Sequence, residues 1–333
     1  MSRLDAPIFL LCSERSGSNL ITKMFDAHPS IAAPGTSHLF RTFSQISWRY
    51  EAGDRTLKED IVRAFRNKVG SWQIDDQSDR ELLALMAGAP HAAEMIAALM
   101  EAELSREGKT AFFVKENFVY QFIPFAEAAA KNPRYIFLVR DPRNMAASWQ
   151  EAAVLRGGIV RAARRWVDDQ MGFLRTCSWM SGRRKIARLT YESLVADPSA
   201  ALAQACEDLD LDYDSAMLDF ANKSRSAAMD AQRSSVWKNI AKPVFANDPN
   251  KFASVLNDDQ ITYIETLCGP LMTEFGYETS KRIDKDSSEF QQLETDLEQV
   301  EPWTKSAYDD LPLEERRKFE AWSANFAELT KLT

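Results

Sequence analysis

Cysteine and histidine are scarce in this chain of 333 residues, which has only four cysteines and three histidines. The cysteines are scattered, and none of them belongs to a Cys-x-x-Cys pair or lies beside a pair of histidines. Disulfide frameworks and zinc sites both need such clusters, so the sequence argues against disulfides and against a metal site. The four cysteines are Cys12, Cys177, Cys206 and Cys268.

Long apolar runs are also missing. A helix that spans a bilayer needs about 20 consecutive apolar residues, whereas the longest run near the start, Ile8–Cys12, has only the length of a strand. Residues Met1–Pro7 lack the basic region, the long apolar stretch and the cleavage site of a signal peptide. The sequence therefore predicts a soluble, cytoplasmic protein without a transmembrane segment.

An excess of positive charge is absent as well. Lysine and arginine number 41 against 49 aspartates and glutamates, and the formal net charge is −8. Proteins that bind nucleic acid are expected to have a basic face, so no nucleic-acid partner is predicted. A small anionic ligand is still compatible with this charge, because a few local cations and a helix N-terminus are enough to hold one.

What the chain does contain is a series of short apolar segments separated by helical patterns. Such segments predict parallel strands that are buried on both faces, so the fold class is α/β, with a central parallel sheet flanked by helices. Residues 38–108 have a mostly helical pattern, and we expect them to form a lid or an acceptor pocket. The predicted strands are Pro7–Cys12, Ala111–Val114, Tyr135–Val139 and Ile186–Leu189.

The composition changes near Lys281. Residues 281–333 contain 8 lysines or arginines against 13 aspartates or glutamates, and their pattern predicts two helices. We expect one domain over residues 1–280, followed by an acidic helical extension that packs on the core or on a second subunit of a homodimer. Charged helices usually form solvated faces, so no chemistry is assigned to the extension.

A first motif, Ser13–Asn19, lies between an apolar strand and an amphipathic helix. Gly17 allows a tight turn, and the amides that follow point out of the helix start, where the helix dipole favours an anion. Arg15 adds a positive charge, and Ser16 and Ser18 add hydroxyl donors. The motif differs from the GxxxxGK[ST] loop of nucleotidases, because serine and not lysine follows Gly17.

A second motif begins where the strand Tyr135–Val139 ends. Arg140 lies at the carboxyl end of this strand, where open parallel sheets bind ligands. Pro142 is typical of a helix start, which places Ser148 about two helical turns later. An anion beside this helix could contact both the Arg140 guanidinium, whose fork suits phosphate, and the Ser148 hydroxyl.

Together, the two motifs resemble those of the sulfotransferases that use 3′-phosphoadenosine-5′-phosphosulfate (PAPS). Residues 13–19 resemble the family's 5′-phosphosulfate loop, and Arg140 and Ser148 have the spacing of its 3′-phosphate motif. The segment Arg188–Pro198 resembles the part of the family in which a tyrosine, here Tyr191, commonly contacts the adenine. The resemblance covers roughly residues 6–280 and leaves out the acidic extension.

The resemblance implies a P-loop-like fold with five parallel strands and an enzyme that moves the sulfuryl group of PAPS to a hydroxyl or amine, releasing adenosine 3′,5′-bisphosphate (PAP). Arg15 would contact the phosphosulfate and stabilise charge on the leaving oxygen. A late basic segment would close over the cofactor. The implied cofactor-binding residues are Arg15, Ser16, Gly17, Ser18, Asn19, Arg140, Ser148, Tyr191, Arg233, Lys242 and Lys251.

The resemblance also implies a catalytic lysine and a base. Lys115 follows the second predicted strand, where the family often has a lysine. The family's catalytic histidine is replaced by Asn117, which cannot act as a base. His38, after a Pro-Gly turn, is the first candidate base because imidazole titrates near neutral pH; Glu116 is the second and His28 the third. A base is dispensable if the acceptor is an amine or is already ionised.

Two alternatives stay open at this point. One is a kinase-like phosphotransferase on the related fold, against which the serine after Gly17 and the pair of Arg140 and Ser148 both argue. The other is a degenerate sulfotransferase domain that binds nucleotide without catalysis. The acceptor is not named by the sequence, although the negative net charge favours an apolar or lipid-like small molecule over a polyanionic glycan.

Overall fold

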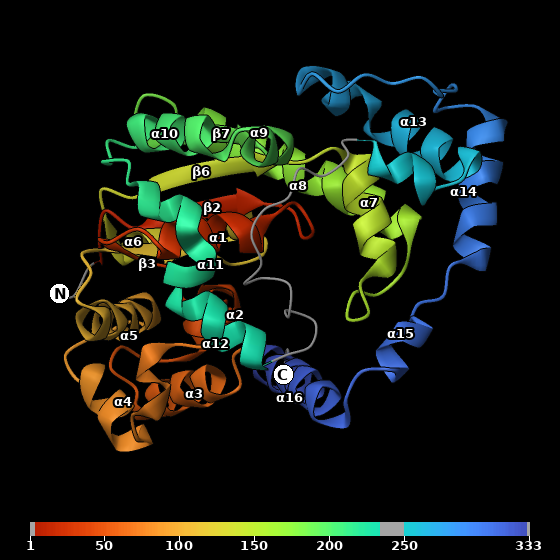
Figure 1. The fold of residues 1–333 in the computed structure, drawn as a ribbon. Helices are drawn as coiled ribbons and strands as arrows, with labels where there is room; N and C mark the ends of the chain where they lie inside the picture. The colour runs from red at the N-terminus through yellow and green to blue at the C-terminus, as the bar shows by residue number, and fades with distance from the viewer. Residues whose placement is uncertain (1–3, 234–249, 332–333) are drawn as a thin grey trace.

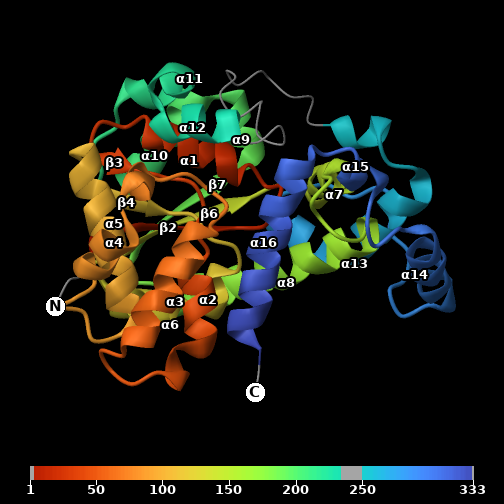
Figure 2. The same ribbon diagram turned by 90° about the horizontal axis from the view of Figure 1, so that it is seen from below.

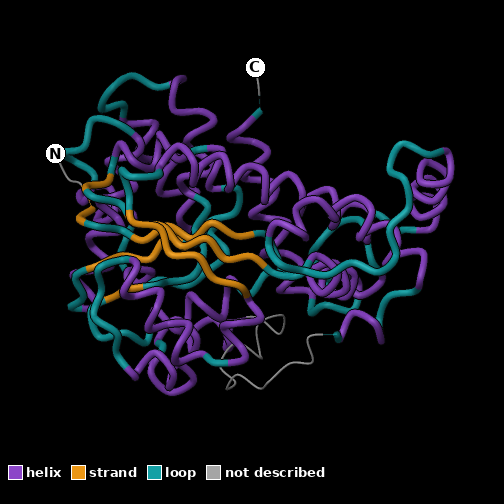
Figure 3. The backbone as a smooth tube through the Cα atoms, turned by 90° about the horizontal axis from the view of Figure 1, so that it is seen from above, coloured by secondary structure: helices purple, strands orange, loops and turns teal. Residues whose placement is uncertain are grey.

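The computed structural model describes residues 4–233 and 250–331, and it has a central sheet with helices on both faces (Figures 1 and 3). The sheet has five strands in the order β3-β4-β2-β6-β7, and all neighbouring strands are parallel. The predicted α/β class is confirmed. The strands are β2 (Ile8–Cys12), β3 (Ile31–Ala32), β4 (Ala111–Val114), β6 (Arg134–Val139) and β7 (Lys185–Thr190).

All four predicted strands are present, and their ends differ from the prediction by at most one residue. The strands that the sequence did not reveal have two residues each, which is too short for a recognisable pattern. They are β3, at the edge of the sheet, and the separate parallel pair of β1 (Leu4–Asp5) and β5 (Ala130–Lys131).

β2 lies in the middle of the sheet, between β4 and β6. The chain adds β3 and β4 on one side of β2 and then β6 and β7 on the other, so the winding reverses next to β2. In open parallel sheets, ligands bind beyond the carboxyl ends of the strands at such a reversal. The residues that directly follow the three strands there are Ser13, Lys115 and Arg140.

Alternate residues of the strands belong to two hydrophobic cores, one on each face of the sheet. Leu10 of β2 packs with Phe25 and Leu202 on one face, whereas Phe9 packs with Phe40 on the other. The first face is covered by helices that lie together in Figure 2. They are α1 (Ser18–Asp26), α9 (Tyr191–Ala196), α10 (Pro198–Asp208), α11 (Phe220–Lys223) and α12 (Arg225–Arg233).

The second core is the larger one and includes most of the helical segment 38–108. Its aromatic side chains are largely structural, since Phe40, Phe43, Phe65 and Trp72 are fully buried. The helices of this core are α2 (Leu39–Ile46), α3 (Arg55–Arg66), α4 (Asp79–Leu85), α5 (Ala92–Glu107), α6 (Ile123–Ala128), α7 (Pro142–Glu151), α8 (Ile159–Met180) and α13 (Asp258–Glu274).

The acidic extension packs on its own chain. Phe290 of α14 stacks on Tyr263 of α13, with 5.3 Å between ring centroids, and the last helix lies across α2 and α3 (Figure 2). It is therefore an integral part of the folded chain, while the predicted homodimer stays a prediction. The helices of the extension are α14 (Ser288–Val300), α15 (Ser306–Asp309) and α16 (Leu313–Thr330).

The cysteines, the helix lengths and the metal-ligand side chains in the described parts of the chain bear on three predictions from the sequence. All four cysteines are buried and unpaired. Within residues 4–233 and 250–331, no helix has the length and apolar character needed to cross a bilayer. In the same residues, no group of three or more histidine, cysteine, aspartate or glutamate side chains is placed to hold a metal ion.

Asp26 fixes α1 in place from the buried end of that helix. Its Oδ2 accepts hydrogen bonds from the hydroxyls of Ser224 and Ser226, at 2.6 and 2.8 Å, and its Oδ1 accepts one from the amide of Ala33 at 3.1 Å. The ammonium of Lys109 lies 3.6 Å from the same Oδ1. These bonds tie α1 to the start of α12.

We expect Asp26→Ala to lower the free energy of unfolding by about 3–5 kcal/mol, because it leaves the buried amides of Ala33 and Ser226 and the hydroxyl of Ser224 without the carboxylate that accepts their bonds. Denaturant unfolding followed by circular dichroism measures this loss. The exposed Asp219, which accepts one bond from Asn222, is the control, and Asp219→Ala should cost less than about 1 kcal/mol. Equal losses for the two variants would contradict the role given to Asp26.

Candidate active site

The loop between β2 and α1 offers free hydrogen-bond donors. Gly17 has a φ of 91° and directly precedes α1, a backbone conformation that favours glycine. The first amides of α1 have no partner within the helix, and the helix dipole adds positive potential there. The hydroxyl of Ser16 is buried and has no hydrogen-bond partner among the described residues. The loop can therefore receive an anion.

The two sequence motifs meet beside this loop. Nε of Arg15 donates to Oγ of Ser148 over 3.0 Å, and Nη1 of Arg140 donates to the carbonyl of Arg15 over 2.7 Å. Asp141 caps α7 by accepting the amide of Arg143 at 2.8 Å, which fixes the helix that carries Ser148. Nε of Arg140 is buried without a partner in the described residues. Side chains 125 residues apart in sequence thus form one cationic cluster.

Tyr191 completes the cluster from the first turn of α9. The guanidinium carbon of Arg140 lies 4.2 Å from the centroid of the Tyr191 ring. A methyl group on Gly17 would lie less than 3.0 Å from two carbons of the same ring. The glycine is therefore required both by its φ and by the close approach of the tyrosine.

We expect Gly17→Ala to weaken the binding of PAP, the ligand implied by the resemblance, by about 10-fold, because the new methyl group strains the backbone by about 1–2 kcal/mol and displaces Tyr191. Calorimetry with PAP measures this change. Gly53 also has a positive φ, 78°, but a methyl group there has no atom within 4 Å. Gly53→Ala should therefore cost stability alone, and a loss of PAP affinity in this control would contradict the argument.

Two polar contacts connect the loop to the end of β4. The ammonium of Lys115 donates to Oδ1 of Asn19. The side-chain amide of Asn117 donates to Oε1 of Glu14 over 3.0 Å. Asn117, which replaces the family's histidine in the sequence, thus positions a carboxylate of the loop.

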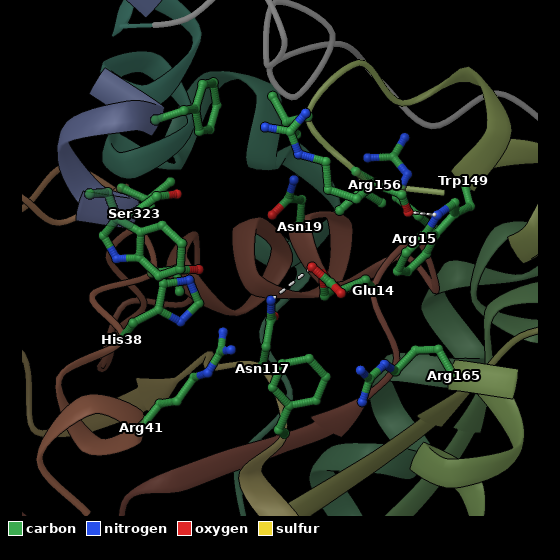
Figure 4. Close-up of a pocket in the computed structure, with 18 of the residues that line it drawn as sticks. Glu14, Arg15, Asn19, His38, Arg41, Asn117, Trp149, Arg156, Arg165 and Ser323 are labelled. Carbon is green, nitrogen blue, oxygen red and sulfur yellow. Dashed lines mark hydrogen bonds between the residues drawn. The ribbon is translucent and has the colours of Figure 1, made fainter. Parts of the chain in front are cut away.

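These side chains border a cavity of about 490 Å³ (Figure 4). Glu14 lies near the middle of the view and points toward Asn117, with Arg41 and Arg165 on either side. Six of the lining residues are cationic and two are acidic. The cations are Arg15, Arg41, Lys115, Arg156, Arg161 and Arg165, and the acids are Glu14 and Glu320.

The sequence profile described as the sulfotransferase family matches residues 7–215, which is more than half of the chain. The chain belongs to the sulfotransferase family. Its fold is similar to a sulfotransferase domain from the curacin biosynthetic pathway, at 17% identity and a TM-score of 0.60, with 84% of this chain and all of that domain covered. A kinase identity is thereby set aside.

A second similar structure is the sulfotransferase domain of the olefin synthase of Synechococcus PCC 7002, at 18% identity and a TM-score of 0.58, with 84% of this chain and 98% of that domain covered. At these identities the likeness concerns the fold. A comparison with curated proteins found no match. The family profile ends at residue 215, so the last helices of this sulfotransferase lie outside it.

The three predicted base candidates occupy different places in the sulfotransferase. Glu116 follows β4, and its buried carboxylate lies against the start of α2. There it accepts hydrogen bonds from Ser37 Oγ and from the amides of Phe40 and Arg41 at 2.9–3.3 Å. Burial raises the pKa of Glu116 to about 7. Glu116 does not line the cavity, and its bonds fix α2.

His28 also lies outside the cavity lining, since its ring is bonded to the carbonyl of Asp212 and the amide of Ser30. His38 does line the cavity. Burial lowers the pKa of His38 well below its usual range, and Arg41 and Lys115 lower it further. The imidazole is therefore neutral near pH 7.

Glu14 is the acid that the sequence prediction passed over. Burial raises the pKa of Glu14 above its usual range, although Arg41 and Arg165 oppose this shift. No pattern in the sequence assigns a role to Glu14 within the loop motif. Its position opposite Asn117 becomes visible only when β2 and β4 are paired.

Three residues that line the cavity have a strained backbone conformation with positive φ. Arg15, His38 and Phe118 line it and have φ values of 65°, 59° and 62°. Residues other than glycine rarely adopt this left-handed conformation, and strain of this kind is common at functional sites. The surrounding packing thus holds three lining side chains in fixed orientations.

The C-terminal helix α16 lines one side of the cavity, although the sequence assigned no chemistry to the extension. Trp322 of α16 contacts the ring of His38, with centroids 5.1 Å apart. Arg63 donates to Glu328 over 2.9 Å, which fastens the helix to α3. The lining residues from this extension are Tyr308, Phe319, Glu320, Trp322 and Ser323.

The late basic segment is described only in part. Arg233 is the last residue of α12, and Lys242 lies outside the described residues. The ammonium of Lys251 lies 3.9 Å from Glu151, at the end of the helix that carries Ser148. Lys251 is thus near the 3′-phosphate motif, and its role there stays a prediction.

Proposed function

We propose that this sulfotransferase uses PAPS as its donor and moves the sulfuryl group to a hydroxyl or amine of a small acceptor, with release of PAP. The observation that carries the proposal is the cluster of Arg15, Arg140, Ser148 and Tyr191 around the phosphate loop. Its members come from the loop after β2, the end of β6 and the helices α7 and α9. We also propose the cytosol as its location, because the four cysteines are unpaired.

The free donors of the site fit the charges of PAPS. Arg140 and Ser148 would hold the 3′-phosphate, with Nε of Arg140 available for a further bond. Ser16 and the amides at the start of α1 would hold the 5′-phosphate, together with Gly17, Ser18 and Asn19. Tyr191 would lie against the adenine, and Arg233, Lys242 and Lys251 are proposed to cover the nucleotide.

PAPS, when bound, supplies an activated sulfuryl group on its 5′-phosphate. A bond forms between the acceptor oxygen and sulfur, and the bond between sulfur and the phosphate oxygen breaks. Arg15 and Lys115 stabilise the negative charge that develops on that departing oxygen. Preorganised cations of this kind supply a large part of the catalysis in group transfer.

We propose Glu14 as the base that accepts the acceptor's proton. Its carboxylate lies in the cavity, one of its oxygens is held by Asn117, and its raised pKa improves its basicity. His38 is the second candidate, because it is neutral and lines the same cavity. Glu116 is not proposed as a base, because its carboxylate accepts hydrogen bonds from backbone amides of α2.

Incubation of the purified protein with PAPS labelled on sulfur, in the presence of a pool of small hydroxyl and amine compounds, tests the proposal. We expect label to appear in an acceptor together with one equivalent of PAP. Label that appears only as inorganic sulfate, or no loss of PAPS at all, would contradict transferase activity. Tight PAP binding without transfer would favour the degenerate binding module.

A further inference from the structure

The part of the cavity wall around Glu14 is strongly cationic, although the protein as a whole is acidic. Arg41 comes from α2, and Arg161 and Arg165 lie one turn apart on α8. Within residues 4–233 and 250–331, none of these three arginines forms a salt bridge. Nε of Arg161 is buried and has no hydrogen-bond partner among the same residues. The three guanidinium groups are therefore available to a ligand.

Aromatic rings hold the arginines in place. The guanidinium carbons of Arg41 and Arg165 each lie 4.5 Å from the centroid of Phe118, and Arg161 lies 4.4 Å from that of Trp303. Phe118 keeps its ring there in spite of a strained φ of 62°. Burial lowers the pKa of Arg161, and Arg165 lowers it further by repulsion. Arg165 also lowers the pKa of Arg41, so the three like charges repel one another, and a bound anion would relieve this repulsion.

The donor does not account for these charges. Arg15, Lys115 and the start of α1 adjoin the 5′-phosphosulfate in the proposed function, and Arg140 serves the 3′-phosphate. Glu14, Glu116 and Asp169 interact with the remaining arginines. Burial raises the pKa of each of these acids, so their carboxylates offset the three cationic charges only in part. A positive surplus is left on the acceptor's side of the cavity.

We propose that the acceptor carries an anionic oxyacid group, such as a carboxylate, that binds to Arg41, Arg161 and Arg165 while its hydroxyl or amine faces Glu14. The inference rests on the proposed function and names the class of its acceptor. Guanidinium forks bind such groups through paired charge-assisted hydrogen bonds. The cationic lining of the cavity thus favours an anionic acceptor, whereas the net charge of −8 had favoured an apolar or lipid-like one.

The rest of the wall sets the shape of this acceptor. Trp322 and Phe319 of α16 face the cavity together with Phe118, so the body between the two polar ends is expected to be flat and apolar. A volume of about 490 Å³ suits a small hydroxylated acid. We therefore use 4-hydroxybenzoate as the probe, with its methyl ester as the neutral match.

Calorimetry on the protein saturated with PAP tests the proposal without requiring turnover. We expect 4-hydroxybenzoate to bind at least 10-fold more tightly than methyl 4-hydroxybenzoate. Arg165→Gln should remove this preference. Arg164→Gln is the matched control, because Arg164 is the adjacent residue, pairs with Glu298 at 2.6 Å and does not line the cavity; it should keep the preference.

Equal affinity for acid and ester, no binding of the acid, or an unchanged preference in Arg165→Gln would each overturn the anionic acceptor. PAP binding is measured first on the same samples. If the wild-type protein does not bind PAP, the proposed donor is contradicted. If it binds PAP but shows no preference for the acid over the ester, only this inference is contradicted. A parallel titration with 4-hydroxyphenyl phosphate distinguishes a phosphate-bearing acceptor from a carboxylate.

Discussion

Replacement of Arg140 by alanine is expected to weaken PAP binding by about 100-fold. The guanidinium forms the proposed bonds to the 3′-phosphate, stacks on Tyr191 and donates to the carbonyl of Arg15. A bidentate, charge-assisted contact of this kind contributes about 3 kcal/mol, which corresponds to that factor. Calorimetric titration of wild type and variant with PAP measures the change.

Two further variants make this prediction specific. Arg140→Lys keeps the charge but loses the planar fork, so an intermediate loss of affinity is expected. Arg188 is an exposed arginine on the neighbouring strand β7, and Arg188→Ala should bind PAP like wild type. Equal affinities for Arg140→Ala and Arg188→Ala would show that the nucleotide binds elsewhere.

The second large effect is expected for Glu14→Gln, which should lower turnover by about 100- to 10,000-fold, the usual contribution of a general base. Glutamine keeps the size of the side chain and an oxygen for the bond from Asn117, but it cannot take up a proton. PAP affinity should change little. Rates of PAP release with a working acceptor measure the loss.

The pH profile separates a base from a structural residue. Because burial raises the pKa of Glu14, the fall of kcat/KM toward acid pH should begin above the range of an ordinary glutamate, and this limb should vanish in Glu14→Gln. Glu320 is the other acidic residue that lines the cavity, and Glu320→Gln should retain the wild-type pH profile. If His38→Gln removes the limb and Glu14→Gln does not, His38 is the base.

The side of the site where the nucleotide is proposed to bind was predictable because it is built from local patterns. An apolar strand followed by a polar turn with Gly17 indicates an anion loop, and an arginine at a strand end with a serine two turns later indicates a second contact. Their meeting also follows from the sequence, since both strands end at the same edge of a parallel sheet. The bond between Arg15 and Ser148 is the direct result.

The acceptor side was not predictable for physical reasons. Arg41, Phe118 and Arg165 are far apart in the sequence and come together only when α2, the end of β4 and α8 are packed. The spacing of Arg161 and Arg165 places them on one face of a helix, but such pairs usually face solvent. The net charge of −8 was a poor guide to the acceptor, because it sums the charges of the whole chain. The cavity itself is lined by six cationic and two acidic residues.

The contacts of the C-terminal helix α16 could not be predicted from the sequence either. Its charged composition is typical of a solvated helix, and only tertiary packing brings Trp322 against His38. His38, the first base candidate from the sequence, lines the cavity. The tryptophan that contacts it could not be inferred from spacing. Long-range contacts of this kind leave no periodic pattern in the sequence.

Calorimetric titration of the purified, metal-free protein with PAP, beside adenosine 5′-monophosphate and ATP with magnesium, is the most direct test of the central claim. The arrangement of Arg15, Arg140 and Ser148 predicts tight binding of PAP without a metal ion, and much weaker binding of the monophosphate, which lacks the 3′-phosphate. Binding of magnesium ATP, with no binding of PAP, would contradict the account of the site.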